Sequence, residues 1–271
     1  GRIQPLESAR TLPFAAAPPG DLLYLLPMAE GEVLRVLQQA YPGGVTFTEL
    51  DEGGQRALFN VFRVPRDQVL AAQAATVAVT AGGADNLTVF SFSAPALDIT
   101  WPSRALAASP FAARVTGSLV APVSGVYTFA ATQSAGANLL LTLDDMLVLD
   151  SSLDMLSQSL PLVQGVYDLT LTYRSETQPG NLRITWQRPG GVMETIGGTA
   201  LHVPALPRQG LVASYYADAQ FTGAPVMQRK ELVVGADPAP PLPYSVHWRG
   251  KLAAPRTGEY LLGAAGSGLL Q

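Results

Sequence analysis

The sequence predicts a mainly β protein: an antiparallel β-sandwich, preceded by a small α/β (β-α-β-β) domain and followed by a second, incomplete β-sandwich. Three observations predict this class. Helical periodicity is confined to the first 75 residues, and short alternating segments separated by turn residues fill the rest of the chain. Residues 111–127 also recur, without a gap, as residues 244–260. Many short strands with a repeated hairpin are typical of sandwiches built from a duplicated unit.

The first 26 residues predict a linker and then a strand. Residues 1–20 are rich in proline, alanine and glycine, which disfavours a helix and predicts a linker. Residues 21–26 are an apolar run closed by Pro27, the pattern of a buried central strand. Between residues 30 and 41 the apolar side chains repeat at helical spacing, and a Pro-Gly-Gly sequence ends the predicted helix.

Two strands and a short helix complete the small domain, which we place at residues 21–75. Residues 45–50 and 57–64 alternate as strands across a glycine-rich turn, and a short helix is predicted over residues 66–74. The turn after the first strand contains a single glycine, Gly31, which is too few to hold a phosphate group. Nucleotide binding is therefore not expected there.

From residue 76 onward the chain carries only strand signals, and we place a sandwich at residues 76–191. Besides the hairpin at 111–127, the predicted strands are 76–80, 87–92, 97–101, 138–143, 147–149, 166–173 and 182–186. A proline- and glycine-rich stretch predicts a linker at residues 192–208. Residues 209–271 are then expected to be a second domain of the same kind, truncated at Gln271.

The repeated hairpin predicts duplication of a whole domain. In the first copy an alternating strand from Phe111 is broken by Pro122 and Gly125, which favour a turn. Six positions keep the same residue type in both copies: Gly117, Leu119, Ala121, Pro122, Gly125 and Tyr127 match Gly250, Leu252, Ala254, Pro255, Gly258 and Tyr260. An ordinary hairpin explains the alternation, but it does not explain why the same loop occurs twice.

Composition excludes several classes of function. The 271 residues are 48% hydrophobic and 14% charged, enough for a large core, and their length predicts about two domains. The net charge is −4 and the 17 basic residues form no cluster, so no nucleic-acid partner is expected. There is no cysteine, which excludes disulfides and thiolate ligands. No stretch reaches the roughly 20 apolar residues of a membrane span, so a membrane is expected only through segments outside this chain.

Several separated motifs resemble the protective-antigen (PA14) domain family, in the family's order. In the first copy they begin at Phe111, Ala121, Gly125, Leu143, Gly165 and Leu182; in the second they are the opening at 210–216 and the strand at 245–250. The resemblance covers residues 76 to 271, with degenerate opening strands in the first copy. It implies a sandwich that acts outside the cytoplasm, in glycosidases, glycosyltransferases, adhesins and toxins, and that often binds carbohydrate.

The resemblance also identifies candidate site residues. In its sugar-binding members two adjacent aspartates after the Tyr-Thr-Phe strand hold calcium, but here Gln133, Ser134 and Gly136 occupy that loop, and residues 266–268 are Gly-Ser-Gly. Neither loop has the carboxylates that a hard cation requires, so calcium is disfavoured and no cofactor or metal is expected. Asp144 and Asp145 stand where the family has an Asp-Gly turn, so a turn is favoured over a metal site. These five residues form the candidate ligand loop.

A second, shorter resemblance concerns the N-terminal part. Residues 22–26, 33–43 and 59–66 look like the soluble region that follows the membrane helices in bacterial glycosyltransferases of the dolichyl-phosphate-mannose type. This implies a membrane-anchored parent protein whose catalytic part lies upstream, and it leaves open whether the parent is an enzyme.

Within this chain no catalytic constellation is found. The two histidines, His202 and His247, belong to no triad or metal motif, and the second is expected to face outward from a strand. Trp101 and Trp186 are expected to pack in the core rather than to stack on sugars. We therefore expect a non-catalytic carbohydrate-binding or cell-surface module that is extracytoplasmic: periplasmic, on the surface or secreted. The alternative is a protein-protein scaffold subunit that binds no sugar.

Overall fold

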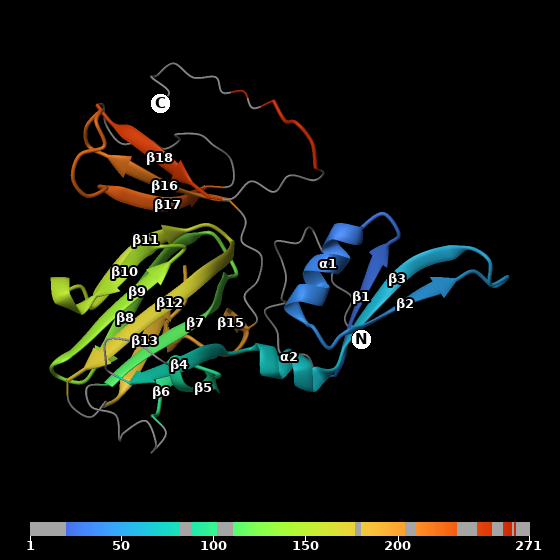
Figure 1. Cartoon of the computed structure of the whole chain (residues 1–271), viewed down its shortest axis with the longest axis horizontal. Helices are drawn as coiled ribbons and strands as arrows, with labels where there is room; N and C mark the ends of the chain where they lie inside the picture. Colours follow the sequence, from blue (N-terminus) through green and yellow to red (C-terminus); the bar gives the residue numbers. More distant parts are fainter. Residues whose placement is uncertain are drawn as a thin grey trace.

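The computed structural model shows three units in chain order (Figure 1). It describes residues 20–81, 88–101, 111–176, 180–203, 210–231, 243–250, 257–261 and 263. We call residues 20–74 the N-terminal unit, residues 75–203 the sandwich, and the strands between residues 211 and 249 the C-terminal sheet. The predicted linker at residues 1–20, apart from Gly20, lies outside the described residues.

The N-terminal unit is the predicted β-α-β-β arrangement with a second short helix. Its elements are β1 (Leu22–Pro27), α1 (Gly31–Ala40), β2 (Val45–Leu50), β3 (Ala57–Val64) and α2 (Arg66–Ala72). The antiparallel sheet has the order β1-β3-β2, so β3 is central. The prediction that β1 is a buried central strand is wrong, because β1 is an edge strand and every second side chain faces away from α1.

The two faces of this small sheet differ sharply. On one face Tyr24 and Phe62 are buried with Leu37 of α1 in a common core. On the other face Leu23 and Val45 are 61% and 59% exposed. Apolar side chains therefore cover both faces of β1, which explains why a continuous apolar run looked like a strand buried on both sides.

The sandwich consists of two antiparallel sheets, as predicted. The larger has the order β10-β9-β12-β7-β4-β5 with β15 beside β7, and the smaller the order β11-β8-β13-β14 with β6 beside β13. Its strands are β4 (Ala75–Ala81), β5 (Thr88–Ala94), β6 (Asp98–Ile99), β7 (Phe111–Ala121), β8 (Gly125–Gln133), β9 (Ala137–Leu143), β10 (Met146–Asp150), β11 (Ser157–Leu162), β12 (Gly165–Ser175), β13 (Leu182–Gln187), β14 (Met193–Thr195) and β15 (Leu201–His202). The core between the sheets includes Trp101 and Trp186, which confirms both tryptophan predictions.

The sandwich extends further than its predicted end at residue 191. β14 pairs with β13 and β15 pairs with β7, and Ile196 and Leu201 between them are fully buried in the core. Residues 193–202 are therefore part of the sandwich rather than of the predicted 192–208 linker. Gly197 allows a close approach of two chain segments here, because an added Cβ would lie 2.7 Å from the Cβ of Ala96.

The C-terminal sheet has three strands, β16 (Leu211–Tyr216), β17 (Met227–Glu231) and β18 (Ser245–Arg249). Their order is β17-β16-β18, and both pairings are antiparallel. Figure 1 shows this sheet beyond one end of the sandwich. Residues 251–256, which include the first half of the predicted second turn at residues 255–258, lie outside the described residues.

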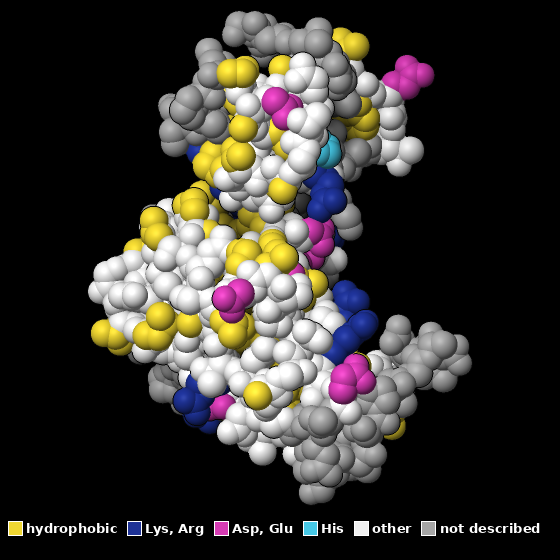
Figure 2. All heavy atoms as spheres, turned by 90° about the vertical axis from the view of Figure 1, so that its left-hand side faces the viewer, with side chains coloured by type: hydrophobic (Ala, Val, Ile, Leu, Met, Phe, Trp, Pro, Cys, Tyr) yellow, Lys and Arg dark blue, Asp and Glu magenta, His cyan; other side chains and the backbone are white. Residues whose placement is uncertain are grey.

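Figure 2 shows one side of the molecule, on which charged side chains are few while hydrophobic side chains recur across it. In the described ranges, no helix has the length and apolar character needed to span a bilayer.

Candidate functional site

The first half of the candidate ligand loop is the turn between β8 and β9. Gln133 ends β8, and its Nε2 donates a hydrogen bond to the Ala137 carbonyl oxygen at 2.9 Å, which closes the turn. Gly136 has a φ of 76°, a left-handed conformation that glycine adopts without strain. Ser134 is half-buried and Gly136 is exposed. The turn therefore presents one hydroxyl and backbone groups, with no carboxylate.

The second half is the turn between β9 and β10, formed by Asp144 and Asp145. Their φ values of 50° and 66° are those of a two-residue hairpin turn, in which both central residues are left-handed. Aspartate tolerates this conformation better than most residues. Because the seven residues of β9 separate the two turns, they lie roughly 20 Å apart at about 3.3 Å per residue. The structure does not bring the five candidate residues into one site.

Asp144 makes a buried ion pair with Lys230 of the C-terminal sheet. The Lys230 Nζ lies 2.5 Å from Asp144 Oδ2, and the two side chains are only 2% and 1% exposed. Lys230 also donates a hydrogen bond to the Val166 carbonyl oxygen and stands 3.9 Å from the centre of the Tyr167 ring. The other carboxylate oxygen of Asp144 accepts a hydrogen bond from the Asp168 N–H at 2.8 Å. Both charges are thus compensated without water or metal.

Asp145 makes a second contact with the C-terminal sheet, at the surface. Its carboxylate accepts a hydrogen bond from Arg249 at 3.0 Å, and the two side chains are 72% and 63% exposed. The two adjacent aspartates therefore join the sandwich to the C-terminal sheet through one buried and one exposed ion pair. We call this pair of contacts the interdomain clamp.

Two further acidic residues near this turn, Asp150 and Asp154, have local roles. The Asp150 side chain accepts hydrogen bonds from the backbone and hydroxyl of Ser152 at 2.8 and 2.6 Å, and so caps the short helix η2 (Ser151–Leu153). Asp154 ends that helix in a left-handed conformation. Within the described ranges, no group of three or more His, Asp or Glu side chains is arranged to hold a metal ion.

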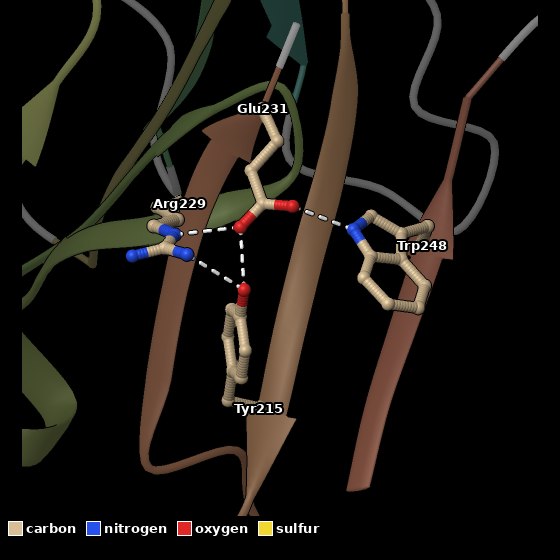
Figure 3. Close-up of polar contacts among 4 residues, drawn as sticks. All are labelled: Tyr215, Arg229, Glu231 and Trp248. Carbon is tan, nitrogen blue, oxygen red and sulfur yellow. Dashed lines mark hydrogen bonds and ion pairs between the residues drawn. The ribbon is translucent and has the colours of Figure 1, made fainter. Parts of the chain in front are cut away.

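A polar network crosses one face of the C-terminal sheet (Figure 3). Glu231 accepts hydrogen bonds from Tyr215 at 2.5 Å, from Arg229 at 2.7 Å and from the Trp248 indole at 2.6 Å. Arg229 also donates a hydrogen bond to the Tyr215 hydroxyl at 2.7 Å. One carboxylate therefore links all three strands β16, β17 and β18.

The network sets the protonation of its members. Burial opposes ionisation of Glu231, but the hydrogen bonds from Trp248, Tyr215 and Arg229 outweigh it and hold the pKa of the carboxyl below its ordinary value. Burial and the neighbouring Glu231 raise the pKa of Tyr215 to about 12. At neutral pH the network thus contains an ionised Glu231 carboxylate and a protonated Tyr215 phenol that donates to it. These contacts give the network a structural role in joining the three strands.

The two histidines lie where no catalytic role is supported. His247 is exposed on β18, as expected. His202 is fully buried in β15, with its ring 5.3 Å from the ring of Tyr41 in the N-terminal unit. Sequence reasoning placed His202 in a linker, because a two-residue strand gives no periodic signal.

Comparison with solved structures finds distant likenesses, among them two chains with similar descriptions. Both are described as anti-sigma factor domain-containing proteins, one of them from Clostridium clariflavum. The first is 20% identical with a TM-score of 0.42, and the Clostridium protein is 19% identical with a TM-score of 0.40. In each case the match covers 59% of this chain and 59% of the other. At these values the likeness carries no argument about function.

Comparison with curated proteins finds no match. Comparison with family models finds one matching model, for the centre of the chain. The match begins two residues before β6 and ends in the short helix η3 (Gly198–Ala200), so it covers most of the sandwich. Residues 96–199 of this chain match the model of the PA14 domain, which supports the predicted family for this part of the protein.

Proposed function

We propose that this chain is a non-catalytic, extracytoplasmic region whose PA14 sandwich binds carbohydrate without a calcium ion. The observation that carries the proposal is that Asp144 and Asp145, adjacent carboxylates on a PA14 sandwich, are both ion-paired with basic side chains of the next unit. A carboxylate held by lysine or arginine is not available to a divalent cation. The interdomain clamp therefore supports a structural role for Asp144 and Asp145. It also supports sugar binding that does not require calcium.

The turn of Gln133, Ser134 and Gly136 is the part of the candidate ligand loop that we propose for contact with ligand. It offers the hydroxyl of the half-buried Ser134, which lies beside Gly180, and an exposed backbone at Gly136. Hydroxyl and amide groups hydrogen-bond neutral polar ligands as both donors and acceptors. This chemistry supports a neutral sugar rather than an anion or a metal.

The contacts of the sandwich support a fixed orientation for this surface. The side chain of Val166 packs in the core of the N-terminal unit, while its carbonyl oxygen accepts the hydrogen bond from Lys230. The start of β12 thus contacts both neighbouring units. We propose that these contacts fix the orientation of the sandwich relative to its two neighbouring units, so that its ligand-binding turn faces a cell surface or a neighbouring protein.

A glycan array with and without a chelator tests this proposal. We expect retention of the chain on a defined set of glycans, unchanged by chelation, and weaker retention of Ser134→Ala. Asp145→Asn is the matched control and is expected to bind as the unmodified chain does. Retention that disappears on chelation contradicts the metal-free proposal, and absence of any retention contradicts carbohydrate binding.

We also propose that the C-terminal sheet is the opening of a second PA14-type copy. In the repeat alignment Trp248 corresponds to Val115, and their partners across the neighbouring strand are Ala213 and Val77 respectively. The order β17-β16-β18 then repeats β5-β4-β7. The pairing of the third strand agrees as well. When Ala213 is aligned with Val77, every residue pair between β16 and β17 falls on a residue pair between β4 and β5. This supports duplication beyond the hairpin that suggested it.

The proposed second copy differs from the first at its inner face. Arg229 stands opposite Ala213 as Phe92 stands opposite Val77. The first copy thus has an apolar side chain where the C-terminal sheet has a charged one. The Glu231 network is therefore a polar replacement for an apolar core, which explains why its donors are so fully used. Circular dichroism and hydrogen exchange of a separately expressed residue 210–271 segment, extended by whatever follows in the reading frame, would test whether it folds as its own sandwich.

For location and parentage we propose the periplasm, the cell surface or the secreted fraction, and a membrane-bound glycosyltransferase as parent. The PA14 match supports the location, because domains of this family act outside the cytoplasm. The parentage rests on the N-terminal sequence resemblance alone. Protease protection of tagged protein in intact cells tests the location, and the full reading frame tests the parentage: absence of upstream membrane helices contradicts it.

A scaffold function is the second candidate, and one observation favours it. The N-terminal unit exposes an apolar sheet face that includes Leu23, Leu25, Val45 and Phe47. Contiguous exposed apolar surface marks interaction sites in soluble proteins. If this face is the functional one, Leu25→Ser with Phe47→Ser should abolish co-purification of a protein partner while leaving glycan retention unchanged.

A further inference from the structure

The N-terminal sheet has one covered face and one open face. The covered face packs with α1 and α2 in a core that also includes Val120 and Val166 of the sandwich. We call the opposite face the outer face. Because side chains alternate along a strand, β1, β3 and β2 together place three rows of register partners on it. In Figure 1 the β2–β3 hairpin points away from the sandwich.

The middle row of the outer face is entirely apolar. It consists of Leu25, Val61 and Phe47, which are register partners across the three strands. Leu25 and Phe47 are 58% and 43% exposed, and Val61 between them is 4% exposed. Leu23 and Val45 extend the apolar surface into the first row. A continuous apolar surface of this kind is typical of a site that another protein covers.

The charged residues of the outer face lie at its two ends. Arg63 is in the first row, and its Nε and one Nη contact the Asp21 carboxylate at 2.8 and 2.7 Å. A guanidinium has five N–H donors, so Arg63 retains donors for a second carboxylate. Glu49 is in the third row with Pro27 and Phe59. It is exposed, and within the described ranges its carboxylate has no hydrogen-bond or ion-pair partner.

A second copy of the chain matches this pattern when a two-fold axis crosses the strands at the middle row. Such an axis reverses the strand direction, so the acidic end of each copy lies over the basic end of the other. Glu49 of one copy then lies over Val45 of the other, one strand away from Arg63. Each apolar side chain of the middle row faces its own equivalent. Face-to-face sheets pack in this way with their strands nearly aligned.

The charges also select the direction of the axis. A two-fold axis along the strands would place the Arg63 side chains of the two copies opposite each other and would leave Glu49 over an apolar strand. Like charges repel at such short separations. A partner with strong charge of one sign fits less well, since the outer face carries one basic and one acidic side chain at opposite ends.

We propose that the outer face binds a second copy of this chain, in a two-fold dimer that stacks the N-terminal sheets and places Glu49 of each copy near Arg63 of the other. The proposal deepens the scaffold function given above and rests on it, because it names the partner of the same apolar face. It does not depend on carbohydrate binding, since the β8–β9 turn lies on a different unit.

Sedimentation velocity of the whole chain over a range of concentrations tests the proposal. We expect a concentration-dependent dimer. Leu25→Lys with Phe47→Lys should weaken association by about a hundredfold or more, because unpaired charges would be buried. Glu49→Arg should weaken it by about threefold to tenfold, since two partly exposed ion pairs are lost. Val126→Lys is the matched control, because Val126 is 60% exposed on β8 of the sandwich.

A single thiol tests the geometry of the dimer. The chain has no cysteine, so Leu25→Cys introduces one thiol, which faces its own equivalent across the proposed axis. A short bis-maleimide should join two chains of this variant and should leave Val126→Cys as single chains. Circular dichroism checks that each variant keeps its fold. If the two lysines unfold the N-terminal unit, Leu25→Ser with Phe47→Ser replaces them in the same comparison.

The outcomes separate the dimer from the scaffold function. A chain that stays monomeric at every concentration overturns the dimer. A dimer that survives the middle-row variants, or that cross-links equally at both cysteine positions, lies elsewhere and also overturns the proposal. If the chain is monomeric and Leu25→Ser with Phe47→Ser still loses a different co-purifying protein, the dimer is overturned and the scaffold function stands. A dimer that the middle-row variants dissociate and the control keeps supports the proposal.

Discussion

Lys230 is the residue whose replacement should most clearly separate the C-terminal sheet from the sandwich. Its ammonium group contacts the Asp144 carboxylate, the Val166 carbonyl oxygen and the Tyr167 ring, which belong to the sandwich. Lys230→Met keeps most of the side-chain volume and removes the charge. It leaves the Asp144 carboxylate buried with the hydrogen bond from the Asp168 N–H as its remaining named contact.

The expected cost follows from the burial of both partners. Removing one partner of a buried ion pair typically costs about 3–5 kcal/mol, because the other charge stays in a low dielectric. For Lys230→Met we expect the upper part of this range. Asp144→Asn should cost about 3 kcal/mol, since its remaining oxygen still accepts from Asp168 and Lys230 keeps its other two partners. The double variant should cost less than the sum, with a coupling of about 2–3 kcal/mol.

Hydrogen exchange followed by mass spectrometry measures this effect locally. Peptides from β16 and β17 report the free energy of opening of the C-terminal sheet, and peptides from β8 and β13 report the sandwich as an internal reference. The matched control is Asp145→Asn, one residue away but 72% exposed with its partner Arg249. An exposed pair contributes about 0–1 kcal/mol, so this variant should exchange nearly as the unmodified chain does.

Equal protection in Asp144→Asn and Asp145→Asn would refute the reasoning, because burial would then make no difference. Additive costs in the double variant would also contradict it, since the two side chains would not be interacting. Loss of protection throughout the sandwich would show that Asp144 acts on the hairpin turn and not on the interface.

Three further predictions concern single positions and pH. Glu231→Gln should destabilise the C-terminal sheet by about 2–3 kcal/mol, because it removes the charged acceptor of Arg229 and Trp248. Hydrogen exchange of the β16 amides measures this loss, and an unchanged exchange rate would show that the network does not stabilise the sheet. The lowered pKa of Glu231 stabilises the folded sheet above the ordinary value of 4.5, and this contribution is lost as the pH falls through the lower folded-state pKa. The raised pKa of Tyr215, to about 12, stabilises the fold below pH 10 and that contribution is lost as the pH rises toward 12. Protection of β16 measured from pH 2 to 11 should therefore fall at both ends, and the Glu231→Gln variant should lack the acid-side fall. Gly197→Ala should lower the free energy of unfolding in urea by about 1–3 kcal/mol, because the new Cβ would lie 2.7 Å from Ala96 Cβ and 2.9 Å from the Pro95 carbonyl oxygen. Gly190→Ala is the control for backbone strain, because its Cβ would meet no atom within 4 Å while its φ is 70°.

The local pattern of apolar and turn residues was enough to predict most strands and the helix α1. Alternation along β7 predicts that Phe111, Ala113, Val115 and Leu119 share one buried face, and the structure confirms it. The elements that the pattern missed are those with weak local signals: β14 and β15 have three and two residues, and β11 contains Pro161. Their pairing is decided by strands far away in the sequence, which local periodicity does not report.

The candidate site shows the same division. A turn at Asp144 and Asp145 was predictable, because aspartate favours left-handed turn positions. The partner of Asp144 was not, since Lys230 lies on another unit and one lysine in a strand is usually solvated.

By itself the sequence determined that this is a mainly β chain with antiparallel strands after a short helical region, since side-chain alternation and turn residues act over a few positions. Only the tertiary structure decided that β1 is an edge strand, that the two turns of the candidate loop lie at opposite ends of β9, and that the aspartates bind the next unit. The physical reason is that strand order, burial and ion pairing depend on contacts between residues distant in sequence, and these exist only once the sheets have assembled.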